Sequence, residues 1–381
     1  MNSLAFIGAA AVFVGLTVFV FFNYPQSWRK NKMFIAVLIL WHIFGLAATV
    51  TVFTVYREIP YEGIRYEITR QASAYYILTM LLAILFGVRF VCVKIYYFVN
   101  RLLKREVREK RKHFIEDKRF HAILFIVISA LIFEAGYFNI DFLKGTRYDI
   151  SIPKKAQEQE LTICLIADIH AGSGTFEYTY DDLADRIDEA EADVLLIAGD
   201  VYDETTCGKD QELVEWVIDT IKMPRYGIYY IYGNHDNSVD DWAAQQMRAM
   251  GVTVLEDEMT TIGEDIQLIG TLDPKAGARP VDQVLAELSP DTDKPVLVLT
   301  HRPKHFQKMA DAGCDLAMAG HTHGFNIPQF LGSAMFEDMY YGIKKYDNMT
   351  AITTSGVAAW GFHYKWPAKS EVVTIHLTFE Q

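Results

Sequence analysis

Residues 161–170 read LTICLIADIH, an apolar run of strand length that ends on an aspartate and a histidine. The same arrangement recurs in residues 194–203, VLLIAGDVYD, and in residues 228–236, IYYIYGNHD. Two further runs end in a similar way, residues 296–301, VLVLTH, and residues 316–324, LAMAGHTHG. Short apolar runs bounded by turn residues predict buried strands. Each of the five predicted strands therefore ends on side chains that can bind a metal ion.

Amphipathic segments separate these runs, so predicted strands and helices alternate along the chain. The segments are residues 180–191, 211–222, 239–250 and 303–312. In α/β layers of this kind, ligands bind beyond the carboxyl ends of the strands. Every candidate ligand falls in that position: Asp168, His170, Asp200, Asn234, His301, His321 and His323. The order of the motifs therefore predicts one shared site.

The donor set indicates which ions such a site would hold. Carboxylate, imidazole and amide donors without a thiolate suit Mn, Fe, Co or Zn better than Mg or Ca, and we take Mn as the preferred ion. Seven ligands exceed what one ion needs, whereas two divalent ions about 3.5–4 Å apart and bridged by a carboxylate would use them all. Burying so many ionisable groups without a metal would cost more than the net stability of a domain.

The first 143 residues have a different composition, with four apolar runs near the ~20 residues that cross a bilayer. The runs are residues 4–22, 33–55, 74–99 and 121–138. The first run could instead be a cleaved signal, but it lacks a basic segment before it and its apolar stretch is too long. We therefore expect a four-helix transmembrane region at residues 1–143, and a multi-pass protein of the cell membrane.

Basic residues are concentrated after the first and third runs, at positions 29–32 and 101–119. Loops rich in Lys and Arg stay on the cytoplasmic side of a membrane. Residues 56–73, between the second and third runs, have fewer basic residues and should face outward. Four spans then place everything after residue 138 outside the cytoplasm.

Net charge separates the two parts of the chain. Residues 1–145 carry 18 Lys and Arg against 9 Asp and Glu, whereas the remainder carries 18 against 39 and so has a net charge of −21. A surface this acidic repels nucleic acid, which we exclude as a partner. The polar residues 144–160, which include Pro153, should be a linker to a catalytic domain at residues 161–381.

Taken together, the motifs resemble the calcineurin-like metallophosphoesterase superfamily, whose pattern of DxH, GDxxD, GNHD, a lone histidine and GHxH is present in full and in order. The resemblance covers residues 161 to about 378 and looks most like the membrane-attached branch, which includes transmembrane proteins with a metallophosphoesterase domain. It implies an α/β fold, a two-sheet β-sandwich flanked by helices. Residues 325–328 depart from relatives in that branch, which often have Gly-Gln after GHTHG, and this leaves the substrate open.

The resemblance also implies a role for each site residue. One metal would be bound by Asp168, His170 and His323, the second by Asn234, His301 and His321, with Asp200 as the bridge. His235 would be the acid that faces the leaving group, and Asp236 would orient its ring.

The sequence thus predicts a metal-dependent phosphoric ester hydrolase that acts on a phosphodiester, phosphomonoester or pyrophosphate at the outer membrane surface. The substrate would be a phosphorylated small molecule or, preferred because the anchor holds the site near the bilayer, a lipid-linked phosphate. Trp360, Phe362 and Trp366 would form the rim of the substrate site, or would simply pack against the C-terminal strand. Two alternatives stay open: a non-catalytic membrane receptor or scaffold with a structural metal site, and an intracellular domain acting on cyclic nucleotides or phosphoproteins. The sequence does not indicate an oligomeric state.

Overall fold

A computed structural model describes residues 3–54, 62–107, 109–172, 177–236, 241–274, 279–324, 338–361 and 363–380. The chain divides into two units, which we describe separately. The first comprises Met1–Tyr56 and Gly63–Ala135, and the second Arg57–Glu62 and Gly136–Gln381.

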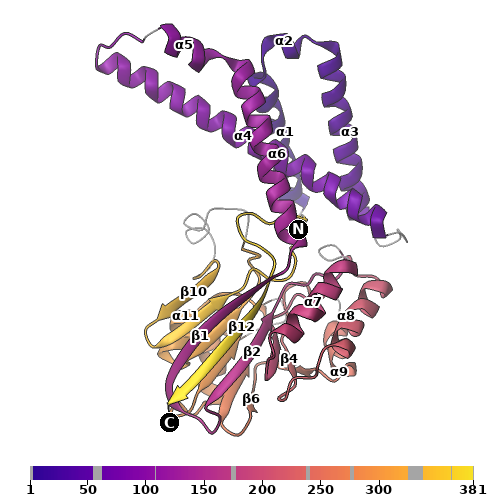
Figure 1. Ribbon diagram of the computed structural model, residues 1–381, viewed down its shortest axis with the longest axis vertical. Coiled ribbons are helices and arrows are strands. Elements are labelled where there is room, and N and C mark those ends of the chain that lie inside the picture. The colour runs from indigo at the N-terminus through magenta and orange to yellow at the C-terminus, as the bar shows by residue number, and fades with distance from the viewer. Residues whose placement is uncertain are drawn as a thin grey trace. The chain divides into compact units, whose positions relative to one another are not determined.

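The described part of the first unit is helical (Figure 1). Its helices are α1 (Ser3–Asn23), α2 (Gln26–Arg29), α3 (Lys32–Thr54), α4 (Glu62–Leu102), α5 (Glu109–Glu116) and most of α6 (Lys118–Asp141). Val20, Phe86 and Phe125 belong to a small buried cluster that joins α1, α4 and α6. Many other large apolar side chains are exposed, among them Met33 at 74% and Phe44 at 61% on α3. Exposed apolar surface on this scale is typical of a surface that contacts a membrane or another protein.

Three helical stretches in the described residues are long and apolar enough to cross a membrane, not the four expected. They are Lys32–Val52, Gly63–Leu102 and Lys118–Asp141. The first expected span lies within α1, whose described apolar stretch, Ala11–Asn23, is shorter. Residues 62–73, expected to be part of a loop, are helical instead, since helix α4 begins at Glu62. At 1.5 Å per residue α4 is ~60 Å long, about twice the thickness of the hydrocarbon core.

Two six-stranded sheets form the centre of the second unit. The first sheet has the order β1 (Lys144–Lys155), β12 (Glu371–Glu380), β2 (Glu160–Ile166), β3 (Val194–Ile197), β4 (Ile228–Tyr230) and β5 (Thr253–Val254). The second has the order β10 (Gly342–Tyr346), β11 (Met349–Thr353), β9 (Leu316–Ala319), β8 (Val296–Leu299), β7 (Ile266–Gly270) and β6 (Glu258–Ile262). Strands β2, β3, β4 and β5 are parallel neighbours, as are β7, β8, β9 and β11.

Side chains alternate between the two faces of each sheet. One face contributes to a core between the sheets and the other to a core under the helices. On β2, Leu165 joins the core between the sheets, whereas Cys164 and Ile166 join the core under the helices. On β8, Leu297 faces the shared core and Val298 the opposite face. Because both faces are buried, the strands are continuously apolar, as the sequence shows.

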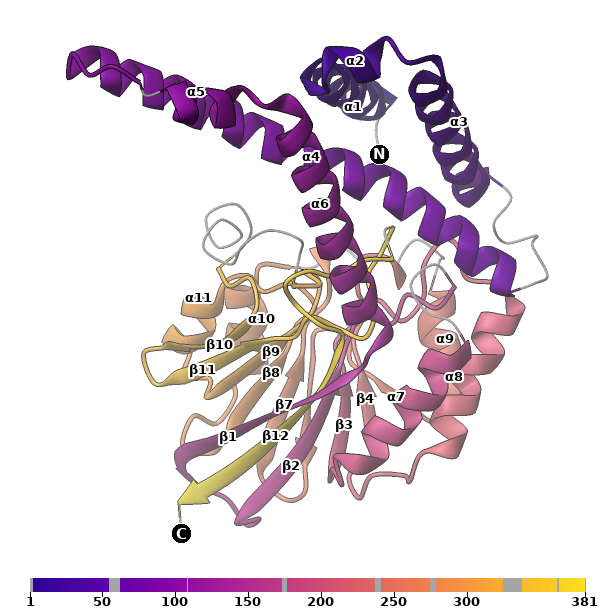
Figure 2. The ribbon, with the colours of Figure 1, turned by 45° about the horizontal axis from the view of Figure 1, so that its top comes forward.

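Helices cover the outer face of each sheet (Figure 2). The first sheet is covered by α7 (Glu177–Glu189), α8 (Gly208–Thr220) and α9 (Trp242–Ala249), which contribute Leu183, Val214 and Met247 to the core. The second is covered by α10 (Val281–Leu288) and α11 (Phe306–Asp311), through residues such as Leu285 and Phe306. The expected two-sheet sandwich flanked by helices is therefore confirmed.

The expected linker at residues 144–160 is wrong, because Lys144–Lys155 is strand β1 and pairs in parallel with β12. Most of its side chains are exposed or half-buried, so as an edge strand it lacks the apolar pattern of the inner strands. Pro153 lies where the register shifts between Ile152 and Lys155, a place at a sheet edge that tolerates proline. Only two residues, Phe142 and Leu143, separate α6 from this strand.

Candidate metal centre

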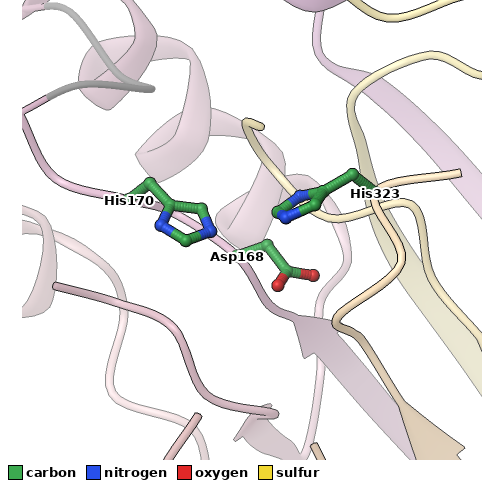
Figure 3. Close-up of side chains that lie close together, drawn as sticks. All are labelled: Asp168, His170 and His323. Atoms are coloured by element: carbon green, nitrogen blue, oxygen red, sulfur yellow. The ribbon is translucent and has the colours of Figure 1, made fainter. Parts of the chain in front are cut away.

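The ends of β2 and β9 bring together the first cluster of metal-binding side chains. Asp168 and His170 follow β2, and His323 follows β9. One ligand atom from each lies within 4.8 Å of those of the other two, and all three side chains face a common point (Figure 3). The Nδ1 atom of His323 lies 3.2 Å from the carbonyl oxygen of Ala358. Since a carbonyl only accepts, Nδ1 donates and the lone pair of Nε2 is left for a metal.

A second cluster, Asp200, His301 and His321, is built in the same way at the ends of β3, β8 and β9. The Nδ1 atom of His301 lies 2.7 Å from the carbonyl oxygen of Ala198 and donates to it. Its Nε2 atom lies 3.3 Å from Asn234 Oδ1 and 3.2 Å from His321 Nδ1. Asn234 is therefore beside this cluster, as the resemblance implies.

Asp200 lies between the two clusters. Its Oδ2 atom is 3.2 Å from His301 Nε2 and 3.7 Å from His170 Nε2. Because His301 donates through Nδ1, its ring in the neutral form would direct the Nε2 lone pair toward this carboxylate oxygen, Asn234 Oδ1 and His321. Facing lone pairs repel unless a cation lies between them. The arrangement thus fits a divalent metal on each side of Asp200.

The pKa values of the metal-free groups indicate the same need for positive charge. Burial alone would lower the pKa of His301, but the charge of Asp200 raises it to about 10. Burial raises the pKa of Asp168 to about 6, although the charge of His301 opposes this shift. Burial, together with the charge of His301, lowers the pKa of His321 to about 2. In the metal-free protein, a proton on His301 would offset the charge of Asp200.

Five of the candidate ligands have a left-handed backbone conformation, which is uncommon for residues other than glycine. The φ angles are 55° for Asp168, 48° for His170, 53° for Asp200, 75° for His321 and 56° for His323. Strained residues of this kind cluster at functional sites, where the surrounding structure holds them in place.

Two glycines are required by close approaches within this site. A Cβ atom on Gly320 would lie 2.8 Å from Asp168 Oδ2, and one on Gly199 would lie 2.8 Å from His301 Nδ1. Glycine at these positions therefore lets the loops after β9 and β3 approach the ligands.

His235, the expected acid, lies at the rim of the site with its side chain 15% exposed. Its ring contacts that of Trp360 at a tilt of 33°, with 4.8 Å between centroids, and lies 5.1 Å from the ring of His170. Its main-chain N–H donates to Asp200 Oδ1 at 2.7 Å, which fixes it beside the candidate bridge. The ring is thus within reach of a group bound between the two clusters.

The carboxylate paired with the His235 ring differs from the expectation. Glu204 Oε2 lies 2.9 Å from His235 Nδ1, and this hydrogen bond lowers the pKa of Glu204. Asp236, expected to orient that ring, is fully buried and accepts main-chain N–H groups instead. Asp236 Oδ2 accepts from Asp200 at 2.6 Å and from Gly233 at 2.9 Å, and Oδ1 accepts from Tyr202 at 2.9 Å. It supports the loops that carry the ligands.

Three residues beside the candidate ligands were not predicted from the sequence. They are Glu204, which pairs with His235, and the ion pair Arg302 and Asp273. Arg302 Nε donates to the buried Asp273 Oδ2 at 2.6 Å, and its Nη1 lies 3.4 Å from His321 Nε2. Glu204 directly follows the GDxxD motif and Arg302 directly follows His301, so adjacency to a ligand is the one signal that could have found them.

The expected aromatic rim is described only in part. Trp360 is 40% exposed and contacts His235, whereas Trp366 is half-buried. Phe362 and residues 325–328 lie outside the described residues.

Comparison with known proteins finds a matching family model and several similar chains. Residues 161–325 match the family model of calcineurin-like phosphoesterases. An uncharacterized metallophosphoesterase of Helicobacter pylori is 25% identical over 95% of this chain and 96% of its own length. A Bos taurus transmembrane protein with metallophosphoesterase domain is 25% identical over 57% of this chain and 53% of its own. The phosphodiesterase YaeI of Escherichia coli is 31% identical over 34% of this chain and 50% of its own.

Residues 161–325 therefore contain a calcineurin-like phosphoesterase domain, and the chain is similar over nearly its whole length to a protein named a metallophosphoesterase. Its described residues also include three helical stretches long and apolar enough to cross a membrane, and the bovine relative is named a transmembrane protein.

Proposed function

We propose that this protein is a membrane-anchored phosphoesterase that uses two divalent metal ions, with Mn as the preferred ion. The observation that carries the proposal is the position of Asp200 Oδ2, 3.2 Å from His301 of one cluster and 3.7 Å from His170 of the other. Asp168, His170 and His323 would bind one ion, and Asn234, His301 and His321 the other. Asp200 would bridge them.

The residues around this centre suit hydrolysis of a phosphate ester. Bound there, two divalent ions would neutralise phosphate oxygens and activate a water for in-line attack. His235 at the rim would donate a proton to the leaving oxygen, and Glu204 would fix the tautomer of its ring. Trp360, whose ring contacts that of His235, would cover one side of the leaving group. Phosphodiesters, phosphomonoesters and pyrophosphates all share the phosphoryl group that this arrangement binds.

The full-length protein in detergent, supplied with Mn, should hydrolyse a generic aryl phosphodiester or phosphomonoester. His235→Ala is expected to lower kcat by about 100- to 10,000-fold, the range of a lost general acid. Glu204→Gln should lower it by only about 10-fold, because the ring remains and merely loses its partner. Initial rates on both substrates measure these effects and establish which ester is preferred.

Metal content measured on the same samples separates the alternatives. Two bound ions without turnover of any phosphate ester would favour a receptor or scaffold with a structural metal site. Equal activity of wild type and His235→Ala would remove His235 from the reaction.

We also propose that the catalytic domain lies outside the cytoplasm. Residues 101–119, which comprise the connection between α4 and α6 and the helix ends beside it, carry 9 of the 16 Lys and Arg of the first unit. Loops this basic stay in the cytoplasm. The chain that follows α6 would then be on the opposite side, whether or not α1 crosses the bilayer. A surface site would favour a lipid-linked phosphate or a soluble phosphorylated small molecule as substrate.

Protease treatment of intact spheroplasts should degrade residues 144–381 and leave the connection between α4 and α6 protected. The reason is that only outward segments meet the added protease. Immunoblots with tags at the C-terminus and after residue 107 read the two segments separately. Protection of the C-terminal tag before lysis and its loss after lysis would place the enzyme inside the cell.

A further inference from the structure

Lys365 is a buried cation close to the first metal cluster. Its side chain is 1% exposed, and Nζ donates to the carbonyl oxygens of Ser355 at 2.6 Å and Gly356 at 2.7 Å. Burial lowers the pKa of Lys365 to about 7, although the charges of Asp168 and Glu371 oppose this shift. Burying an ammonium group is costly, so its retention at this place requires a reason.

The carbonyl groups that Lys365 binds belong to a segment that holds two of the candidate ligands. We call Ser355–Ala358 the brace segment. The N–H of Ala358 donates to the carbonyl oxygen of Asp168 at 2.9 Å, and the carbonyl oxygen of Ala358 accepts from His323 Nδ1 at 3.2 Å. Gly356 has a φ of 73°, and a Cβ atom there would lie 2.6 Å from Asp168 Cβ. The brace segment thus fixes both Asp168 and His323.

The main chain of Lys365 is held by the last turns of α6, which belong to the same unit. The N–H of Lys365 donates to the carbonyl oxygen of Gly136 at 3.0 Å, and its own carbonyl accepts from Asn139 Nδ2 at 3.2 Å. The ring of Tyr364 packs on Gly136 where a Cβ atom would otherwise be. His363 Nε2 lies 2.6 Å from Asp141 Oδ1.

These contacts form a continuous path from the end of a candidate membrane span to a metal cluster. It runs from α6 through the main chain of Lys365 to its ammonium group, and then through the brace segment to Asp168 and His323. The ammonium group makes both of its described hydrogen bonds to protein carbonyls, and its positive charge would repel a metal. Its contribution is therefore geometric: it holds the brace segment against the ligands.

We propose that Lys365 is a positioning residue that connects the C-terminal end of α6 to the first metal cluster, Asp168, His170 and His323. The inference rests on the proposed function only in requiring that the clusters bind metal. Metal binding, rather than turnover, is therefore the property to measure.

Lys365→Met should weaken the binding of one of the two Mn ions by about 10- to 100-fold, as loss of a group that orients ligands does. Affinity for the other ion should change little. The measurement is Mn titration of the full-length, metal-free protein in detergent, read by electron paramagnetic resonance and by thermal unfolding. Gly136→Ala, which displaces Tyr364 from α6, should weaken the same ion.

Lys154→Met is a matched control, since Lys154 Nζ also binds two carbonyls, of Lys294 and Gly313, and pairs with Asp315 at 2.7 Å. It should lower the unfolding temperature but leave both Mn affinities unchanged. Equal Mn affinities in wild type, Lys365→Met and Lys154→Met would overturn the inference. So would a result in which Lys365→Met weakens the binding of both ions equally and in proportion to its fall in unfolding temperature. Two bound ions in a wild type without turnover would contradict the proposed function alone.

Discussion

Asp200→Asn is expected to lower kcat for phosphate ester hydrolysis by at least about 1,000-fold. The side chain keeps its shape but loses the negative charge whose Oδ2 atom lies between His301 and His170. A neutral amide cannot bridge two cations, so the protein should bind fewer than two Mn ions. Initial rates and metal content of the purified variant measure both effects.

Asp193→Asn is the control for this prediction. Asp193 precedes β3, and its carboxylate accepts the main-chain N–H of Thr162 at 2.8 Å, at the opposite end of the strand from Asp200. This variant should keep its two ions and its rate. An Asp200→Asn variant that retained two ions and a rate within tenfold of wild type would exclude Asp200 as the bridge.

Asp236→Ala should have the largest effect on stability, because it leaves three buried N–H groups without their acceptor. The groups belong to Asp200, Tyr202 and Gly233. At about 1–3 kcal/mol for each unsatisfied group, partly recovered by entering water, the free energy of unfolding should fall by about 3–6 kcal/mol. Thermal or denaturant unfolding of the metal-free protein measures the loss.

Comparison with His235→Ala tests whether Asp236 instead acts by orienting the ring of His235. Removing a rim side chain should lower activity while changing the free energy of unfolding by less than about 1 kcal/mol. If Asp236→Ala matched His235→Ala in both activity and stability, Asp236 would be the orienting residue that the family resemblance implies. The contacts with three main-chain N–H groups favour the supporting role.

The clustering of the candidate ligands could be predicted from sequence because it depends on strand direction. Asp168, Asp200, His301 and His321 each follow a short apolar run, and parallel neighbouring strands bring their carboxyl ends to the same edge. Strand direction alone is enough for this prediction, without knowledge of any side-chain contact. The geometry that joins the two clusters follows from the fold itself.

Residues whose partners come from distant turns could not be predicted in this way. Glu204 pairs with His235 across 31 positions, and Lys365 binds carbonyl groups beside Asp168 without any motif of its own. Strand β1 (Lys144–Lys155) could not be predicted from its sequence, because an edge strand with one partner needs few apolar residues.

The junction between α6 and β1 has a consequence for how the proposed enzyme meets its substrate. A flexible linker would let an anchored domain search a volume that widens with linker length, but Phe142 and Leu143 provide almost no reach. Leu143 is itself only 2% exposed. The proposed catalytic domain therefore follows the end of α6, which belongs to the same unit, without a flexible tether, and encounter would depend on the movement of the substrate. Molecules that diffuse laterally in the bilayer would reach such a site by a two-dimensional search, whereas soluble ones must arrive from the bulk.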